Sequence, residues 1–241
     1  MNAHSFVNAH IYSVVMRTAG FALLISVLSI TAPVPAFADD ELLDQWFEAG
    51  RHAEQYHDVR GELQALFARE PIDDLPGELI LRFLREAAVK RVPAERLVPA
   101  VEEYLERLVA AQWAIGEAPH IATVEGDVTA IVEAAVVFLQ TSATADSLLG
   151  LLRYAPSGRH AREVFFTLSE LYGIDDLTSE QLTELGRSIL ESSLSVGSYG
   201  SVASLYVQSR ARQNSPSRVI RTIVDTLDDG GGLVQLRQAL R

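Results

Sequence analysis

Histidines and carboxylates are the residues of this sequence best suited to chemistry, because the chain has no cysteine. His52 and His57 flank the residues AEQY, and a spacing of five puts them about 140° apart around a helix. Helical zinc pairs use the i,i+4 spacing instead. We therefore expect two solvent-exposed histidines rather than a metal site. Glu48 and His52 are the alternative pair, and they would need a remote third ligand.

An acidic, glycine-rich run extends from Asp225 to Gly232. Asp225 and Asp229 fall at positions one and five of a calcium-binding loop. Leu227 and Leu236 occupy positions three and twelve, where such a loop needs oxygen ligands. The run is better interpreted as the C-terminus of a helix that ends at glycine. We therefore expect no metal here.

The serine-rich stretch 192–204 contains the glycine pair of Gly197 and Gly200. No phosphate-binding or dinucleotide-binding fingerprint surrounds the pair, and no serine of the stretch lies in a G-x-S-x-G motif. The stretch is typical of a junction between closely packed helices. We therefore expect no catalytic residue, no cofactor and no enzymatic activity.

Three residues are candidates for a site of another kind. Glu133 is the one carboxylate in the apolar run 128–139, and enclosure there would raise its pKa unless an arginine paired with it. A structural ion pair or a position at the solvent edge is the alternative for Glu133. Tyr199 and Tyr206 are candidate aromatics for binding a partner in a groove between helices.

The charge of the chain limits its partners. There are 32 acidic and 20 basic residues, which give a formal net charge of −12. This sign opposes binding to nucleic acid and to anionic membrane surfaces. A protein or peptide partner is the expectation that remains.

The first 38 residues resemble a secretory signal peptide. Arg17 precedes an apolar run over 19–30, and the segment ends in Ala36-Phe37-Ala38. Twelve apolar residues make about 18 Å of helix, short of the roughly 30 Å hydrocarbon core. We expect cleavage after Ala38 and a periplasmic or extracellular mature protein without an integral membrane span. An uncleaved anchor is the alternative, and translation from Met16 would give a more compact signal.

Apolar residues recur at helical spacing along the mature chain, and alternating strand patterns are missing. The sequence predicts an all-α fold. The expected helices are 41–69, as one helix or as two joined near Gly61, then 77–91, 98–115, 128–140, 143–154, 159–172, 179–194, 201–212, 216–227 and 232–240.

Local signals place several helix starts. Thr178 and Gln181 form a capping-box pattern, and Ser215 precedes a proline at the first helical position. Pro99 lies six residues after Pro93, and a proline inside a helix removes a backbone hydrogen bond. We therefore expect regular helix to begin near Val98.

Two architectures fit this series of helices: an irregular multi-helix bundle, or a short solenoid-like array of helical hairpins. Two successive helices span roughly 35 to 45 residues, the size of a helical-repeat unit. The segments 96–105 and 218–227 also share an arginine, aliphatic positions, an acid and a final leucine. We expect one mature domain over 39–241, with 116–126 as the alternative place for a division.

The segment LREAAVKRVPAERL over 84–97 resembles a short motif of uncharacterised exported bacterial helical proteins. The resemblance covers 14 residues. It implies a helix-turn-helix unit and brings no activity or site residue with it.

These observations favour a non-enzymatic, exported protein that binds a protein or peptide partner between stacked helices. A carrier that holds a small apolar ligand among helices around 128–139 is the second hypothesis. An enzyme with an unfamiliar site is the third.

Overall fold

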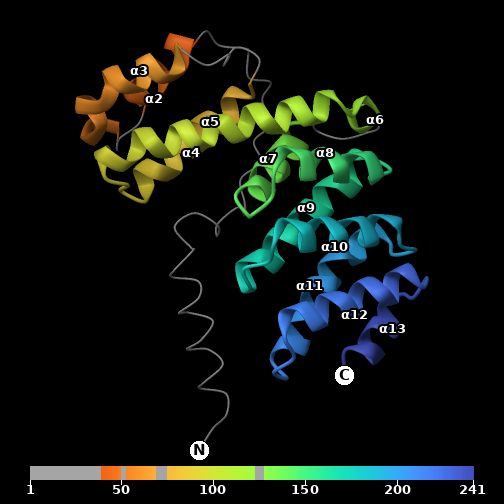
Figure 1. The fold of residues 1–241 in the computed structure, drawn as a ribbon. Coiled ribbons are helices and arrows are strands. Elements are labelled where there is room, and N and C mark those ends of the chain that lie inside the picture. The colour runs from red at the N-terminus through yellow and green to blue at the C-terminus, as the bar shows by residue number, and fades with distance from the viewer. Residues whose placement is uncertain (1–38, 50–52, 69–74, 123–127) are drawn as a thin grey trace, which may run out of the picture. The chain divides into compact units, whose positions relative to one another are not determined.

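The computed structural model describes residues 39–49, 53–68, 75–122 and 128–241. Over these ranges the chain forms twelve α-helices and two 3₁₀ helices, and it forms no strand (Figure 1). The prediction of an all-α fold is confirmed. The expectations for the signal segment and for His52 concern residues outside the described ranges.

The chain divides into two compact units between Trp113 and Ala114. We call the described residues before this point the N-terminal unit and residues 114–241 the C-terminal unit. The division falls inside one long helix, α5 (Ala94–Gly116), close to the region 116–126.

The N-terminal unit packs short helices around an aromatic core. Its other elements are α2 (Asp39–Ala49), η1 (Ala53–Val59), α3 (Arg60–Phe67) and α4 (Gly77–Val89). The rings of Trp46 and Tyr56 stack at 5.6 Å, and those of Phe83 and Tyr104 at 4.2 Å. The hydroxyl of Tyr56 donates to the carbonyl of Val92 at 2.8 Å, which anchors the turn between α4 and α5.

The segment 84–97 spans the end of α4, a tight turn and the start of α5. Arg91 lies in this turn with φ of 52°, a left-handed conformation that glycine adopts far more easily. The amide of Val92 donates to the carbonyl of Ala87 at 3.0 Å, which closes the end of the helix. The segment therefore forms two helices joined by a tight turn.

Pro99 does not delay the start of α5, contrary to the sequence-based expectation. The helix begins at Ala94, and the amide of Leu97 already donates to the carbonyl of Pro93 at 3.1 Å. Because Pro99 lies in the second turn, it removes only the bond to the carbonyl of Glu95. The buried side chains of Leu97 and Val101 lie on either side of it along the helix.

The C-terminal unit begins with the end of α5. Its helices beyond residue 127 follow the predicted ones within three residues at each end, whereas the short helix over 119–122 was not predicted. Thr178 and Gln181 form the predicted capping box, with bonds of 3.0 and 3.3 Å. Ser215 is the N-cap before Pro216, although its side chain makes no capping bond. The remaining elements are α6 (Pro119–Ala122), α7 (Val128–Leu139), α8 (Ala145–Tyr154), α9 (Gly158–Ile174), α10 (Ser179–Glu191), η3 (Val196–Ser198), α11 (Tyr199–Arg210), α12 (Pro216–Asp228) and α13 (Leu233–Ala239).

These helices stack in two layers (Figure 1). In one layer α7 packs on α9, α9 on α11 and α11 on α13. In the other, α8 packs on α10 and α10 on α12. Each helix thus lies against its second neighbour in sequence, so the C-terminal unit has the stacked-hairpin form of the two predicted architectures.

Side-chain hydrogen bonds join successive hairpins at a nearly constant separation in sequence. Ser142 donates to the carbonyl of Leu177, and the hydroxyls of Ser147 and Ser179 share a bond. Further along, Tyr206 donates to Asp175. These pairs are 35, 32 and 31 residues apart. The separation matches the length of one hairpin.

The core between the layers is closely packed around α7 and α9. The rings of Phe138 and Phe165 stack at 5.2 Å. A Cβ atom on Gly158 would lie 2.4 Å from the side chain of Ile131 and 3.0 Å from the carbonyl of Ile121. A side chain at this position would therefore force Ile131 to shift. Among the described helices, none combines the length and the apolar character needed to cross a bilayer.

Candidate functional site

The main cluster of interacting ionisable residues in the C-terminal unit joins the end of α9 to the end of α11. Arg210 donates two hydrogen bonds to the carboxylate of Asp175, from Nε at 2.5 Å and from Nη2 at 2.9 Å. The hydroxyl of Tyr206 donates to the same carboxylate at 2.6 Å. Arg210 also donates to the carbonyl of Asn214. We call Asp175, Tyr206 and Arg210 the clasp.

The clasp changes the acidity of its members. Burial raises the pKa of Asp175, but hydrogen bonds from Arg210 and Tyr206 and the charge of Arg210 outweigh burial and hold this pKa below its ordinary value. Burial, followed by the bond to Asp175 and its charge, raises the pKa of Tyr206 far above the usual range. All three side chains are hydrogen-bonded within the clasp. The clasp therefore stabilises the junction between α9 and α11.

Tyr199 and Tyr206, which the sequence suggested as interaction aromatics, are both buried at 1% and 0% exposure. Tyr206 is held in the clasp, and Tyr199 lies with its ring 6.2 Å from that of His160. Neither ring presents a surface to a partner. The helix α11 turns its aromatic side inward because it packs against α9, α12 and α13.

Glu133 lies in α7 between the buried residues Val132 and Ala134, and it is itself half-buried. The carboxylate is therefore not enclosed in the apolar core. Six apolar residues of α7 are buried because α7 packs mainly on α9 and also on α8, whereas Ala130 and Val137, one turn from Glu133, are half-buried.

The histidines do not assemble a metal site in the described part of the chain. His57 is exposed, as predicted, and its ring stacks on Phe47 at 5.5 Å. Within the described residues, no group of three or more potential ligands among His, Cys, Asp and Glu is arranged to hold a metal ion. His160 accepts or donates a bond of 2.8 Å with Ser157, a contact within the first turn of α9 that stabilises the start of that helix.

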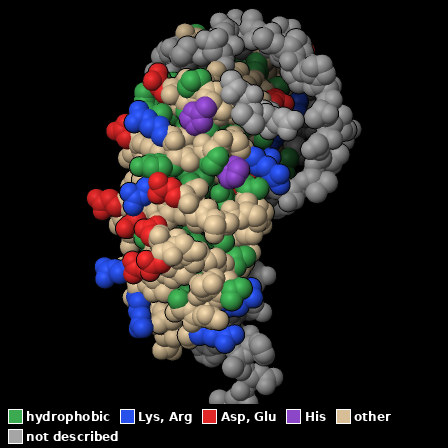
Figure 2. Space-filling view, turned by 90° about the vertical axis from the view of Figure 1, so that its right-hand side faces the viewer, with side chains coloured by type: hydrophobic (Ala, Val, Ile, Leu, Met, Phe, Trp, Pro, Cys, Tyr) green, Lys and Arg blue, Asp and Glu red, His purple; other side chains and the backbone are tan. Residues whose placement is uncertain are grey.

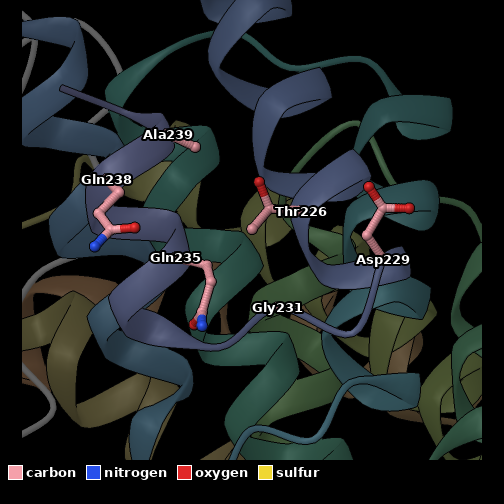
Figure 3. A pocket seen from close by; sticks show the side chains of 6 residues that line it. All are labelled: Thr226, Asp229, Gly231, Gln235, Gln238 and Ala239. Atoms are coloured by element: carbon pink, nitrogen blue, oxygen red, sulfur yellow. The ribbon is translucent and has the colours of Figure 1, made fainter.

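A depression of about 510 Å³ lies between α12 and α13 (Figure 3). It is open to solvent. Its lining comes from the end of α12, from the turn formed by the three glycines 230–232, which we call the glycine turn, and from one side of α13. The residues that line it are Thr226, Asp229, Gly231, Gln235, Gln238 and Ala239.

The glycine turn below the depression is the predicted end of a helix. Gly230 has φ of 79°, and its amide donates to the carbonyl of Leu227 at 2.9 Å. The amide of Gly231 donates to the carbonyl of Thr226 at 2.8 Å. These bonds satisfy the last carbonyls of α12, so the acidic run serves as a helix terminus here.

Within the layer of α7, α9, α11 and α13, exposed charges lie on α9 and α13 (Arg159, Glu170 and Arg237), whereas α11 exposes none. The exposed positions of α11 are uncharged: Gly200, Ser204, Val207 and Gln208. The other layer exposes charges of both signs, namely Asp146, Arg153, Glu180, Glu184, Arg187, Glu191, Arg218, Arg221, Asp225 and Asp228. Figure 2 shows acidic and basic side chains interspersed along one side of the surface in view. We call the exposed surface of α8, α10 and α12 the charged face.

The sequence reasoning missed both the clasp and the depression. Residues of the clasp are 31 and 35 positions apart, so no local motif marks them. The hairpin length of about 35 residues was the only signal that could have suggested such pairs. Comparison with known proteins gives no match to a family model, to a curated protein or to a solved structure.

Proposed function

We propose that this chain is an exported, non-enzymatic protein that binds a protein or peptide partner through the charged face. The observation that carries the proposal is the two-layer stack of hairpins. Such stacks present one row of exposed helix surfaces from each layer, and this geometry provides extended surfaces for protein binding.

The charges favour the face of α8, α10 and α12 over that of α11. Glu184 and Arg187 lie one turn apart on α10, and both are exposed. Interspersed charges give a partner a specific electrostatic pattern to match, and they also accelerate association. The uncharged surface of α11 offers no such pattern.

The carrier hypothesis receives less support. A carrier would need a cavity beside α7, yet the side of α7 that faces α9 is filled by stacked phenylalanines and by the close approach at Gly158. Neither the clasp nor the depression offers an apolar enclosure of the kind that small apolar ligands occupy.

A pair of crosslinking variants tests the binding proposal. A photoreactive amino acid at Glu184 on the charged face should give a discrete crosslinked product in cells. The matched position is Gln208, which is also exposed but lies on α11, and there we expect no discrete product. Identical product patterns at both positions, or no product at either, would contradict the proposal.

Export is tested separately, by sequencing the N-terminus of protein isolated from the producing cells. We expect the mature chain to begin at Asp39, because the small-x-small pattern ends at Ala38. A mature protein that retains the apolar run over 19–30 would contradict cleavage and favour an anchor.

A further inference from the structure

We propose that the depression between α12 and α13 binds a short extended peptide segment that carries a basic side chain. This inference rests on the proposed function and names the chemistry of one part of the partner.

Amide groups make the depression suited to a peptide backbone. Gln235 and Gln238 lie three residues apart, on one side of α13 (Figure 3). Each side-chain amide can donate and accept, as an extended backbone requires. Gln235 already uses its oxygen to accept from the amide of Gly232 at 3.1 Å. This bond fixes the side chain and leaves its NH₂ group as a donor.

Charge selects a basic side chain for the segment. Asp229 is the one ionisable residue among the six that line the depression, and it is exposed at the end of α12. Its carboxylate can pair with an arginine or a lysine of the segment. The net charge of −12 for the whole chain also attracts cationic partners.

Close backbone packing gives the depression its shape. A Cβ atom on Gly231 would lie 2.6 Å from the carbonyl of Thr226, so only glycine allows the turn to approach α12 this closely. The turn, and α13 after it, are therefore held close against the end of α12, where the depression lies.

A titration of the ¹⁵N-labelled mature chain with a blocked pentapeptide, Ala-Ala-Arg-Ala-Ala, tests the inference. We expect saturable chemical-shift changes at the amide of Gly231 and at the side-chain amides of Gln235 and Gln238. The same peptide with glutamate in place of arginine should bind roughly tenfold more weakly or not at all. No saturable change at these groups, or equal binding of both peptides, would overturn the inference.

Two variants of matched charge complete the test. Asp229→Asn should weaken binding of the arginine peptide about two- to fivefold, the range of an exposed ion pair. Asp225→Asn removes the same charge from α12 outside the depression and should leave the affinity unchanged. Equal effects of the two variants would show general charge attraction only and would overturn the inference.

Peptide binding at the depression and crosslinking at the charged face can succeed or fail independently. If the crosslink at Glu184 forms while the peptide fails to bind, the partner uses the charged face without the depression. If the peptide binds at the depression while Glu184 gives no product, the charged face is not the binding surface.

Discussion

At the scale of single residues, the clasp is the most consequential feature, because three side chains from two hairpins satisfy one another. The carboxylate of Asp175 and the guanidinium of Arg210 are only 18% and 27% exposed. Charged groups that are this far removed from water depend on their partners. Removal of one side chain of the clasp would leave partly buried polar atoms of the others without a hydrogen-bond partner.

We predict that Asp175→Asn lowers the free energy of unfolding by about 1 to 3 kcal/mol at neutral pH, because it removes charge-assisted bonds to Arg210 and Tyr206. Urea unfolding measures the change. The control is Glu103→Gln, which breaks a salt bridge on α5 whose glutamate is 63% exposed. That variant should change the free energy by less than about 1 kcal/mol.

The pH dependence of this effect follows from the lowered pKa of Asp175. A carboxylate with a lower pKa in the folded state stabilises the protein fully above its unfolded pKa, which is about 4. The stabilisation is lost as the pH falls through the folded pKa. The gap between wild type and Asp175→Asn should therefore narrow in unfolding experiments below about pH 4. A gap that stays constant down to pH 2 would show that the charge of Asp175 does not matter.

The sequence could suggest single residues only by type. It correctly indicated an exposed His57 and a helix end at the glycine turn, because local spacing determines both. It could not place Tyr199 and Tyr206, since their burial depends on packing between α11 and its neighbours. The same limit applies to Glu133, whose half-buried position depends on the helices around α7.

At the scale of elements, two glycines of α9 have opposite roles. A Cβ atom on Gly158 would crowd the side-chain tip of Ile131 and the carbonyl of Ile121, whereas nothing lies within 4 Å of the corresponding position on Gly173. We predict that Gly158→Ala destabilises the chain by about 1 to 3 kcal/mol through overpacking. Gly173→Ala should stabilise it by about 0.5 to 1 kcal/mol through helix propensity. Thermal unfolding of both variants measures the difference, and effects of equal sign would contradict the packing described for α9.

The turn between α4 and α5 allows a second prediction at this scale. Arg91→Gly should raise the free energy of unfolding by about 0.5 to 1 kcal/mol, because glycine adopts the left-handed conformation without steric penalty. The control is Arg85→Gly in the interior of α4, where glycine should destabilise the helix by about 1 kcal/mol. Urea unfolding compares the two. A destabilising Arg91→Gly would mean that the arginine side chain makes a contact that outweighs the strain of its backbone.

Helix positions could be predicted well because caps, prolines and glycines are local signals. The capping box at Thr178 and the N-cap at Ser215 lie where the sequence places them. The start of α5 could not be predicted from Pro99 alone. Burial of the side chains around it favours the helix, and this contribution is larger than the loss of one hydrogen bond.

At the scale of the whole molecule, the C-terminal unit is held together by contacts between neighbouring hairpins. In such stacks each hairpin is stabilised by the hairpins beside it, and the terminal hairpin has only one neighbour. We predict that native-state hydrogen exchange is slowest in α9 and α10 and faster in α12 and α13. Exchange at a single uniform rate across these helices would show that the unit opens only as a whole.

The class of the fold could be predicted from periodicity, whereas the choice between a bundle and a stack of hairpins could not. Both architectures bury the same apolar stripes. The structure decides between them because α7, α9, α11 and α13 form one layer and α8, α10 and α12 form the other. The function hypothesis came from the same periodicity, but the charged face and the depression required the three-dimensional arrangement.

The nearly constant spacing of the hydrogen bonds between hairpins also has a consequence for how the chain folds. Since these bonds join residues only 31 to 36 positions apart, little loop-closure entropy is lost when one hairpin docks on the previous one. Low contact order of this kind favours fast folding. The C-terminal unit can therefore assemble progressively, hairpin by hairpin.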